Sequence, residues 1–181
     1  MNLVLITDIF GITSGLLEIS KQLNAQIIDP YAGVEMHFND EASAYAYFSE
    51  NIGLDCYLEI LSAKFESLNS ATIAIGFSIG ASVLWRYAAA DTDGKLQRGY
   101  CFYGSQIRNY LQLVPNFPLQ LILPKFEQHF SVAQLADDLA ECKNLTIVKT
   151  GSLHGFMNRC SVNYDRQACQ KQLQQLQAKY C

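Results

Sequence analysis

Short runs of apolar residues recur along the chain, and the longer stretches between them carry apolar residues at helical spacing. Most of the short runs show no alternation with polar residues, which predicts strands buried on both faces of a parallel sheet. Strands are expected at residues 3–6, 26–28, 72–75, 100–103, 119–123 and 145–148. Helices are expected near residues 13–24, 40–67, 79–90, 131–142 and 164–180, and the second should be broken at Gly53.

The last predicted helix carries a single apolar stripe. Cys169, Leu173, Leu176 and Tyr180 repeat at helical spacing, while glutamine and lysine fill the opposite face. Alternating strands and helices with right-handed connections predict a doubly wound sheet covered by helices on both faces. The expected fold class is therefore a compact three-layer α/β structure with about six mainly parallel strands.

Composition narrows the class of protein further. The chain has 181 residues, of which 50% are hydrophobic, and this size predicts a single domain over residues 1–181. The formal net charge is −4 and the 13 lysine and arginine residues are scattered, so neither a nucleic-acid face nor a membrane-surface patch is indicated. The longest apolar runs are far shorter than the ~20 residues that span a bilayer. We expect a small-molecule substrate and a monomer or small homo-oligomer.

The cysteines are spread along the sequence without a C-x-x-C pair, and no cationic segment followed by a long apolar run opens the chain. This cysteine usage favours a reduced, cytoplasmic location. No pattern in the sequence indicates a metal site or a cofactor.

A serine between two glycines, directly after an apolar strand, is the strongest chemical signal. Gly76-Phe77-Ser78-Ile79-Gly80 follows the strand expected at 72–75 and leads into the helix expected at 79–90. In such a nucleophile elbow the serine occupies a strained turn with its hydroxyl exposed, and the glycines allow close approach of the backbone. The alternative is an ordinary glycine-lined turn in a parallel sheet.

A nucleophilic serine needs a base to accept its proton, and the base needs an acid to orient it. His154 follows the last predicted strand at the same sheet edge as Ser78, whereas His37 follows the second strand and His129 lies close to Glu127. Because one class of parallel-sheet enzymes has the chain order serine, acid, histidine, His154 is the expected base and Glu127 the expected acid. The alternative for Glu127 is a solvated loop carboxylate. Other acids lie at the opposite edge or on a helix: Asp91, Asp93, Asp137 and Asp138.

A reacting carbonyl also needs two N–H groups that stabilise its developing negative charge. The backbone of Ile79, directly after the serine, and that of Ile9, after the first strand, are expected to supply them. Cys101 and Cys160 are rival nucleophiles, but neither lies on a turn that would lower the pKa of its thiol.

Five segments of this chain, taken in order, resemble the dienelactone hydrolase family. They are Asp8-Ile9-Phe10-Gly11, Ile28-Asp29-Pro30-Tyr31, Phe102-Tyr103-Gly104, Glu127-Gln128-His129-Phe130-Ser131, and His154-Gly155-Phe156 with Tyr164-Asp165-Arg166-Gln167-Ala168. The resemblance implies the α/β-hydrolase fold, with Ser78 as nucleophile, Glu127 as acid, His154 as base, and the backbones of Ile9 and Ile79 as oxyanion donors. It also implies four substrate-pocket candidates: Asp8, Tyr31, Tyr103 and Arg159.

The chain departs from the family pattern at the positions that bear on substrate choice. Ser78 stands where the family has cysteine, Glu127 replaces an aspartate, and Asn158 stands at the position of an arginine, with Arg159 one position late. An ionised Asp8 beside Ser78 would repel anionic acyl groups, so neutral short-chain esters are expected to react better than carboxylate-bearing ones. The alternative is that Asp8 only caps its own loop.

Only 13 residues separate Gly104 from Pro118, where many α/β-hydrolases insert a lid, so a lidless, open site is expected. The leading hypothesis is a serine hydrolase that cleaves a small ester, lactone or thioester through an acyl-enzyme. The alternative is a non-catalytic small-molecule-binding protein on the same fold. A group of aromatic residues is expected in the core rather than at a ligand surface: Tyr45, Tyr47, Phe48 and Tyr57.

Overall fold

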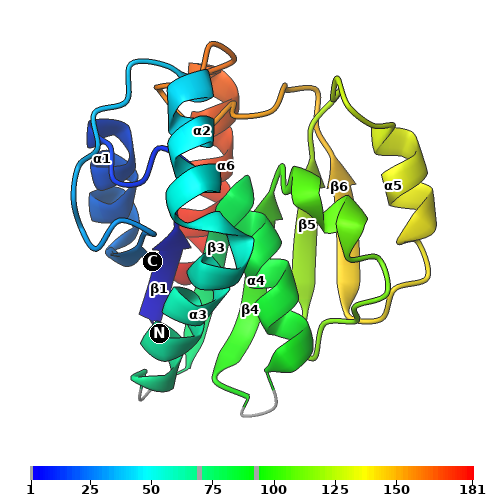
Figure 1. Ribbon diagram of the computed structural model, residues 1–181. Helices are drawn as coiled ribbons and strands as arrows, with labels where there is room; N and C mark the ends of the chain where they lie inside the picture. The colour runs from blue at the N-terminus through cyan, green and yellow to red at the C-terminus, as the bar shows by residue number, and fades with distance from the viewer. Residues whose placement is uncertain (1, 69–70, 92–93) are drawn as a thin grey trace.

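The computed structural model describes residues 2–68, 71–91 and 94–181 (Figure 1). Its sheet has six strands, all parallel, in the order β2-β1-β3-β4-β5-β6. The strands are β1 (Asn2–Ile6), β2 (Ala25–Ile28), β3 (Thr72–Phe77), β4 (Leu96–Phe102), β5 (Leu119–Leu123) and β6 (Leu145–Lys149). The doubly wound sheet expected from the apolar runs is confirmed.

The helices begin where polar residues can cap them. Thr13, Asp40, Ser131 and Asp165 each accept a hydrogen bond from a backbone N–H of the first turn that follows. The helices are α1 (Ser14–Leu23), α2 (Glu41–Asn51), α3 (Gly53–Glu66), α4 (Ile79–Ala90), α5 (Val132–Asp138) and α6 (Arg166–Tyr180), with a 3-10 helix η1 (Ser105–Asn109). The predicted break at Gly53 is confirmed, since the chain adopts φ +72° there.

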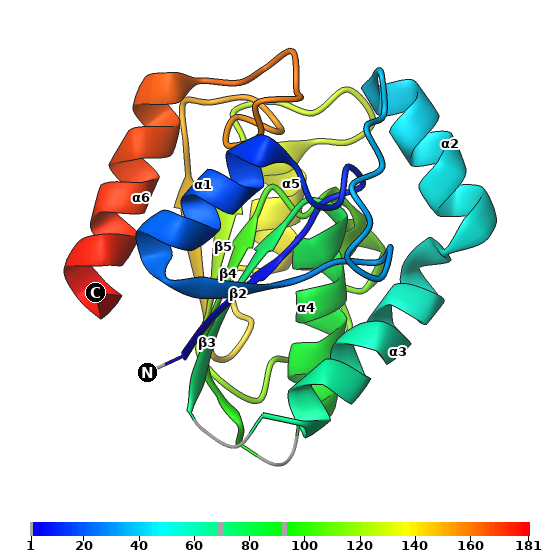
Figure 2. The same ribbon diagram turned by 90° about the vertical axis from the view of Figure 1, so that its left-hand side faces the viewer.

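Helices cover both faces of the sheet (Figure 2). Phe48, Tyr57, Trp85 and Leu135 bring α2, α3, α4 and α5 into one apolar cluster. On the other face α1 and α6 pack through a second cluster, in which the predicted stripe of α6 is buried along Cys169, Leu173 and Leu176. Apolar burial on both faces of the strands is the main source of stability for such a sheet.

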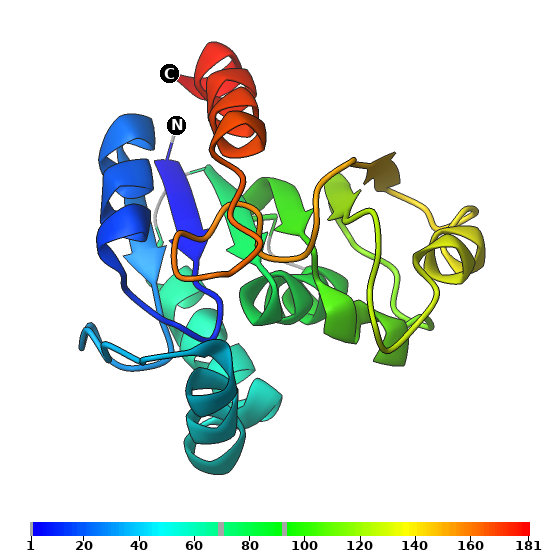
Figure 3. The same cartoon turned by 90° about the horizontal axis from the view of Figure 1, so that it is seen from above.

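The strand order places a topological switch between β1 and β3. The chain leaves β1 for β2 through α1, then returns to β3 on the opposite side of β1 through α2 and α3. The loops after β1 and β3 therefore lead to helices on opposite faces, as the view along the sheet shows (Figure 3). Ligands of open α/β sheets bind at such a point, outside the carboxyl ends of the strands.

Some elements differ from the sequence prediction. β4 begins at Leu96 rather than at residue 100. Its first four residues do not form an apolar run, because the buried Leu96 and Gly99 flank the more exposed Gln97 and Arg98. The helix expected over 131–142 ends at Asp138, and η1 occupies a segment expected to be a loop.

The aromatic residues of α2 and α3 divide between core and surface. Phe48 and Tyr57 are buried as predicted. Tyr45 and Tyr47 are 51% and 40% exposed, so the core assignment was wrong for them. Helical spacing could not separate these residues, because the aromatic positions of α2 extend around more of the helix than one core-facing stripe.

Candidate active site

Ser78 occupies a strained turn between β3 and α4. Its φ and ψ are 50° and −111°, its N–H donates to the Phe102 carbonyl (2.9 Å), and the helix starts at the next residue. A Cβ at position 76 would lie 2.7 Å from the Cα of Ala81, and one at position 80 would overlap the carbonyl oxygens of Ile6 and Thr7. The two glycines are therefore required by close backbone packing, and the strand, turn and helix predicted around Ser78 are confirmed.

Ser78, His154 and Glu127 lie in a continuous chain of hydrogen bonds. The Ser78 Oγ is 2.9 Å from the His154 Nε2, and the His154 Nδ1 is 2.6 Å from the Glu127 Oε1. An ionised carboxylate only accepts, so Nδ1–H donates to Glu127 and the Nε2 lone pair faces the Ser78 hydroxyl. The structure thus brings together the three side chains that the sequence singled out from three loops.

The loops that carry Glu127 and His154 are tied together by the backbone. The N–H of Lys125 donates to the Ser152 carbonyl (2.7 Å), and the Asn163 side chain donates to the His154 carbonyl (3.0 Å). Asn163 was not predicted from the sequence, because it lies outside the segments that carry the family resemblance.

The loop after β1 holds the Ile9 peptide in a fixed position. Asp8 Oδ1 accepts from the Phe10 N–H (2.9 Å), and the Tyr31 hydroxyl donates to the Ile9 carbonyl (2.7 Å). A Cβ at Gly11, whose φ is +67°, would lie 2.6 Å from the Tyr31 ring. Tyr31 therefore supports this loop, and its role as a substrate-pocket residue stays a prediction.

Ile9 and Ile79 both line the cleft that contains Ser78. Neither of their backbone N–H groups makes a hydrogen bond within the part of the chain that the structure describes. Ile79 is the first residue of α4, where the partial positive charge of the helix dipole favours an anion. Two unengaged donors beside a serine hydroxyl are what an oxyanion requires.

Asp8 lines a separate cavity of about 20 Å³ together with Phe77, Tyr103 and Asn158. Its second carboxylate oxygen accepts from the Asn158 side chain (2.7 Å). Asp8 therefore caps its own loop, as the alternative held. Because its charge also interacts with His154, its expected effect on anionic acyl groups stays a prediction.

Desolvation raises the pKa of Asp8 to about 6, against the lowering effects of its hydrogen bonds and of His154. The folded state thus holds the proton more tightly than the unfolded state, so the contribution of Asp8 to stability falls as pH rises from about 4 to about 6. The Asp8 carboxylate interacts electrostatically with titratable groups from several elements: His154, Glu41, Tyr31, Tyr57, Tyr103 and Cys160.

Replacing Asp8 with asparagine is expected to remove this pH dependence. The free energy of unfolding of Asp8→Asn, minus that of the unchanged protein, should rise by about 2 kcal/mol between pH 4 and pH 7, allowing for the partial exposure of the carboxyl. Urea unfolding at several pH values measures this difference. A difference that stays constant with pH would mean that Asp8 titrates normally in the folded protein.

Two other predicted pocket residues have side-chain partners distant in the sequence. Tyr103 is buried, and its ring packs 5.0 Å from that of His154, centroid to centroid, so it supports the imidazole. Arg159 forms a bidentate ion pair with Glu18 of α1, at 2.9 and 2.5 Å. Their roles in a substrate pocket, which the family resemblance implied, stay predictions.

The other candidate bases, nucleophiles and acids are less suited to these roles than His154, Ser78 and Glu127. His129 lines the cleft but makes no hydrogen bond to Ser78 or Glu127 among the described residues, and His37 is not among the residues that line it. Burial raises the pKa of the Cys101 and Cys160 thiols, so neither is a ready thiolate. Of the acids excluded earlier, Asp91 is buried at the end of α4, whereas Asp93 lies outside the described residues.

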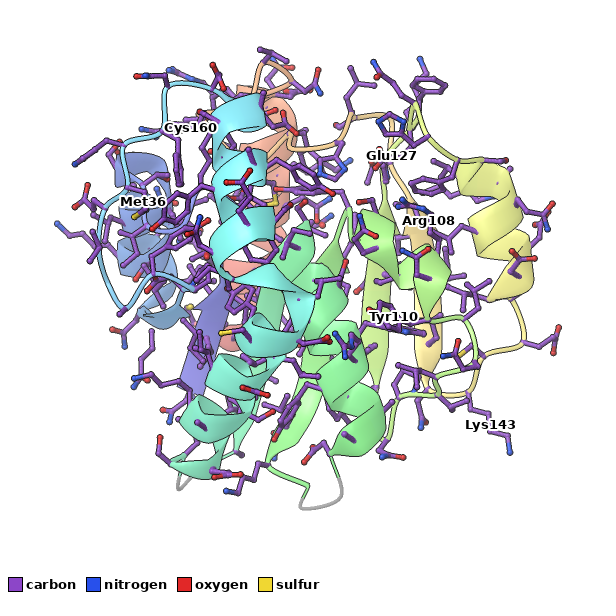
Figure 4. The ribbon with its side chains drawn as sticks, viewed as in Figure 1. Met36, Arg108, Tyr110, Glu127, Lys143 and Cys160 are labelled. Carbon is purple, nitrogen blue, oxygen red and sulfur yellow. The ribbon has the colours of Figure 1, made fainter. Side chains whose placement is uncertain are left out.

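The Ser78 cleft has a volume of about 690 Å³. Its walls include Arg108 and Phe130 next to Glu127, and Tyr45 from α2 (Figure 4 labels Arg108 and Glu127). None of these three was predicted as a site residue. The only signal was weak: Phe130 lies within the acid segment, and Arg108 follows the strand after the elbow.

In the described ranges 2–68, 71–91 and 94–181, no group of three or more histidine, cysteine, aspartate or glutamate side chains is arranged to hold a metal ion. No helix in the same ranges has the length and apolar character needed to cross a membrane.

The sequence matches no protein-family model. It is similar to an uncharacterised protein of Bacillus subtilis, YczH, with 32% identity over 130 residues. The aligned part covers 70% of this chain but only 63% of the length of that relative.

Solved structures with the same fold include a dienelactone hydrolase from Anabaena variabilis (TM-score 0.68, 12% identity, 98% of this chain and 84% of that chain). Another is Est1E from Butyrivibrio proteoclasticus with bound ferulic acid (TM-score 0.64, 11% identity, 99% and 88%). A third is the thioesterase domain of the curacin biosynthetic pathway (TM-score 0.66, 10% identity, 98% and 91%). The chain therefore has the α/β-hydrolase fold that these structures share, as the sequence resemblance implied.

Proposed function

We propose that this protein is a serine hydrolase that cleaves an ester-type bond, in a carboxylic ester, lactone or thioester, through an acyl-enzyme. The observation that carries the proposal is the Ser78–His154–Glu127 chain of hydrogen bonds, which opens onto a cleft beside two unengaged backbone donors. The solved structures of this fold that act on esters or thioesters support the same class of reaction.

In the first half of the reaction, the Ser78 Oγ attacks the carbonyl carbon and its proton passes to the His154 Nε2. The carbonyl oxygen becomes an oxyanion that accepts hydrogen bonds from the N–H groups of Ile9 and Ile79. Glu127 stabilises the imidazolium that has formed. The bond to the leaving group then breaks, and His154 gives its proton to the departing alcohol or thiol.

In the second half, water enters the cleft and attacks the acyl-enzyme. His154 accepts a proton from that water, the same backbone donors hold the second oxyanion, and the bond to Ser78 breaks as its Oγ regains the proton. The carboxylic acid leaves and Ser78 is restored.

A fluorophosphonate probe tests the proposal. The reagent reacts with a serine only where the hydroxyl, a base and an oxyanion site act together, so we expect a single adduct at Ser78. Mass-spectrometric mapping of the labelled peptide locates the adduct. Ser78→Ala should give no adduct, whereas Cys160→Ala should be labelled like the unchanged protein.

The competing function is a non-catalytic protein that binds small molecules in the same cleft. It predicts no labelling under conditions in which a control esterase reacts, or labelling at another residue. Either result would contradict the proposal that this protein is a serine hydrolase.

A further inference from the structure

Four exposed apolar side chains surround the Ser78 cleft. Tyr45, Phe126, Leu153 and Val162 all line it, and we call them the apolar rim. Phe126, Leu153 and Val162 are 59%, 42% and 95% exposed. Large apolar side chains scattered singly need no explanation, but several around one cleft indicate an apolar ligand or partner.

The rim residues are fixed relative to the reacting groups by the chain itself. Phe126 directly precedes Glu127, Leu153 directly precedes His154, and Val162 directly precedes Asn163, which donates to the His154 carbonyl. The rim residues are therefore neighbours in the sequence of the residues that form the hydrogen-bonded chain at Ser78.

Phe130 is a further apolar residue of the cleft, four residues after Phe126 in the acid loop. The Arg108 guanidinium stacks over the Phe130 ring at 5.0 Å while donating to the Ser105 carbonyl (2.6 Å). This cation–π contact orients Phe130 along the wall. Ile9 and Ile79 complete the apolar surface next to the serine.

We infer that the substrate of this site carries an apolar acyl group larger than acetyl, either a medium chain or an aromatic ring, which binds against the apolar rim. The inference rests on the proposed function and names its substrate class. The occupant is the substrate itself because the rim is continuous with the Ser78 cleft, whose volume of about 690 Å³ suits a ligand of this size.

The test compares kcat/KM for 4-nitrophenyl acetate, butyrate, hexanoate and octanoate, each below its solubility limit. Each methylene that reaches the rim should raise kcat/KM by up to about fourfold, so octanoate should exceed acetate by at least about tenfold. Phe126→Ser should lower kcat/KM for octanoate about tenfold and leave that for acetate within about twofold. Val114→Ser is the matched control, because Val114 is 47% exposed and lies outside the cleft.

Two outcomes would overturn the inference. If kcat/KM does not change with the length of the acyl chain, the apolar rim does not bind the acyl group and serves another partner, such as a protein surface. An equal loss for acetate and octanoate in Phe126→Ser would mean that Phe126 acts by positioning Glu127. Fluorophosphonate labelling of Ser78 separates these outcomes from failure of the hydrolase itself, since labelling persists if only the substrate class is wrong.

Discussion

Glu127→Gln is expected to lower kcat for a reactive ester by about 10⁴-fold while the fold stays intact. The Glu127 Oε1 accepts from the His154 Nδ1 at 2.6 Å, which keeps the Nε2 lone pair on Ser78. A glutamine amide facing Nδ1 favours the opposite tautomer, in which Nε2 carries the proton and does not accept one from the serine. Steady-state kinetics with 4-nitrophenyl butyrate, alongside circular dichroism of both proteins, measures the effect.

His129→Ala is the control for this prediction. His129 lines the same cleft but makes no hydrogen bond to Ser78 or Glu127 among the described residues, so kcat should change only a few-fold. If His129→Ala proves more damaging than Glu127→Gln, the base is His129, and the assignment of the acid is also wrong.

Gly80→Ala is expected to lower the free energy of unfolding by about 4 kcal/mol or more. A Cβ at this position would overlap the carbonyl oxygens of Ile6 and Thr7, and backbone atoms of a buried strand cannot move aside as a flexible side chain would. Urea denaturation measures the loss. Variants that do not purify as folded protein can be compared through their soluble yield.

Gly151→Ala is the matched control, because a Cβ there meets nothing within 4 Å and its backbone needs no positive φ. Its free energy of unfolding should differ by less than about 0.5 kcal/mol from that of the unchanged protein. Equal effects at positions 80 and 151 would contradict the packing explanation of the elbow.

The sequence predicted the parts of this molecule that local chemistry determines. Apolar runs gave the parallel strands, because burial on both faces leaves no polar alternation, and the glycines around Ser78 marked a turn that only a close backbone approach explains. His154 and Glu127 followed from the shared sheet edge, since the carboxyl ends of parallel strands lie together.

The sequence did not predict where long side chains point. Arg159 pairs with Glu18, far away in the sequence, and Asp8 turns toward Asn158 near the other end of the chain. The direction of each side chain depends on which partner the folded chain brings within hydrogen-bond distance. A short sequence motif does not include that partner. The apolar rim was missed for a related reason: Phe126 and Leu153 read as ordinary apolar loop residues until the loops are placed around one cleft.

The adjacency of rim and reacting residues limits how this protein can acquire new specificity. Phe126 and Leu153 each share a peptide bond with a residue of the hydrogen-bonded chain, so inserting or deleting residues in either loop would move the proton relay along with the binding surface. Substitutions of side chains at a fixed loop length would change the binding surface without moving the hydrogen-bonded residues. Diversity among relatives of this protein should therefore appear as substitutions at rim positions, with loop lengths held constant between Leu123 and Glu127 and between Lys149 and His154.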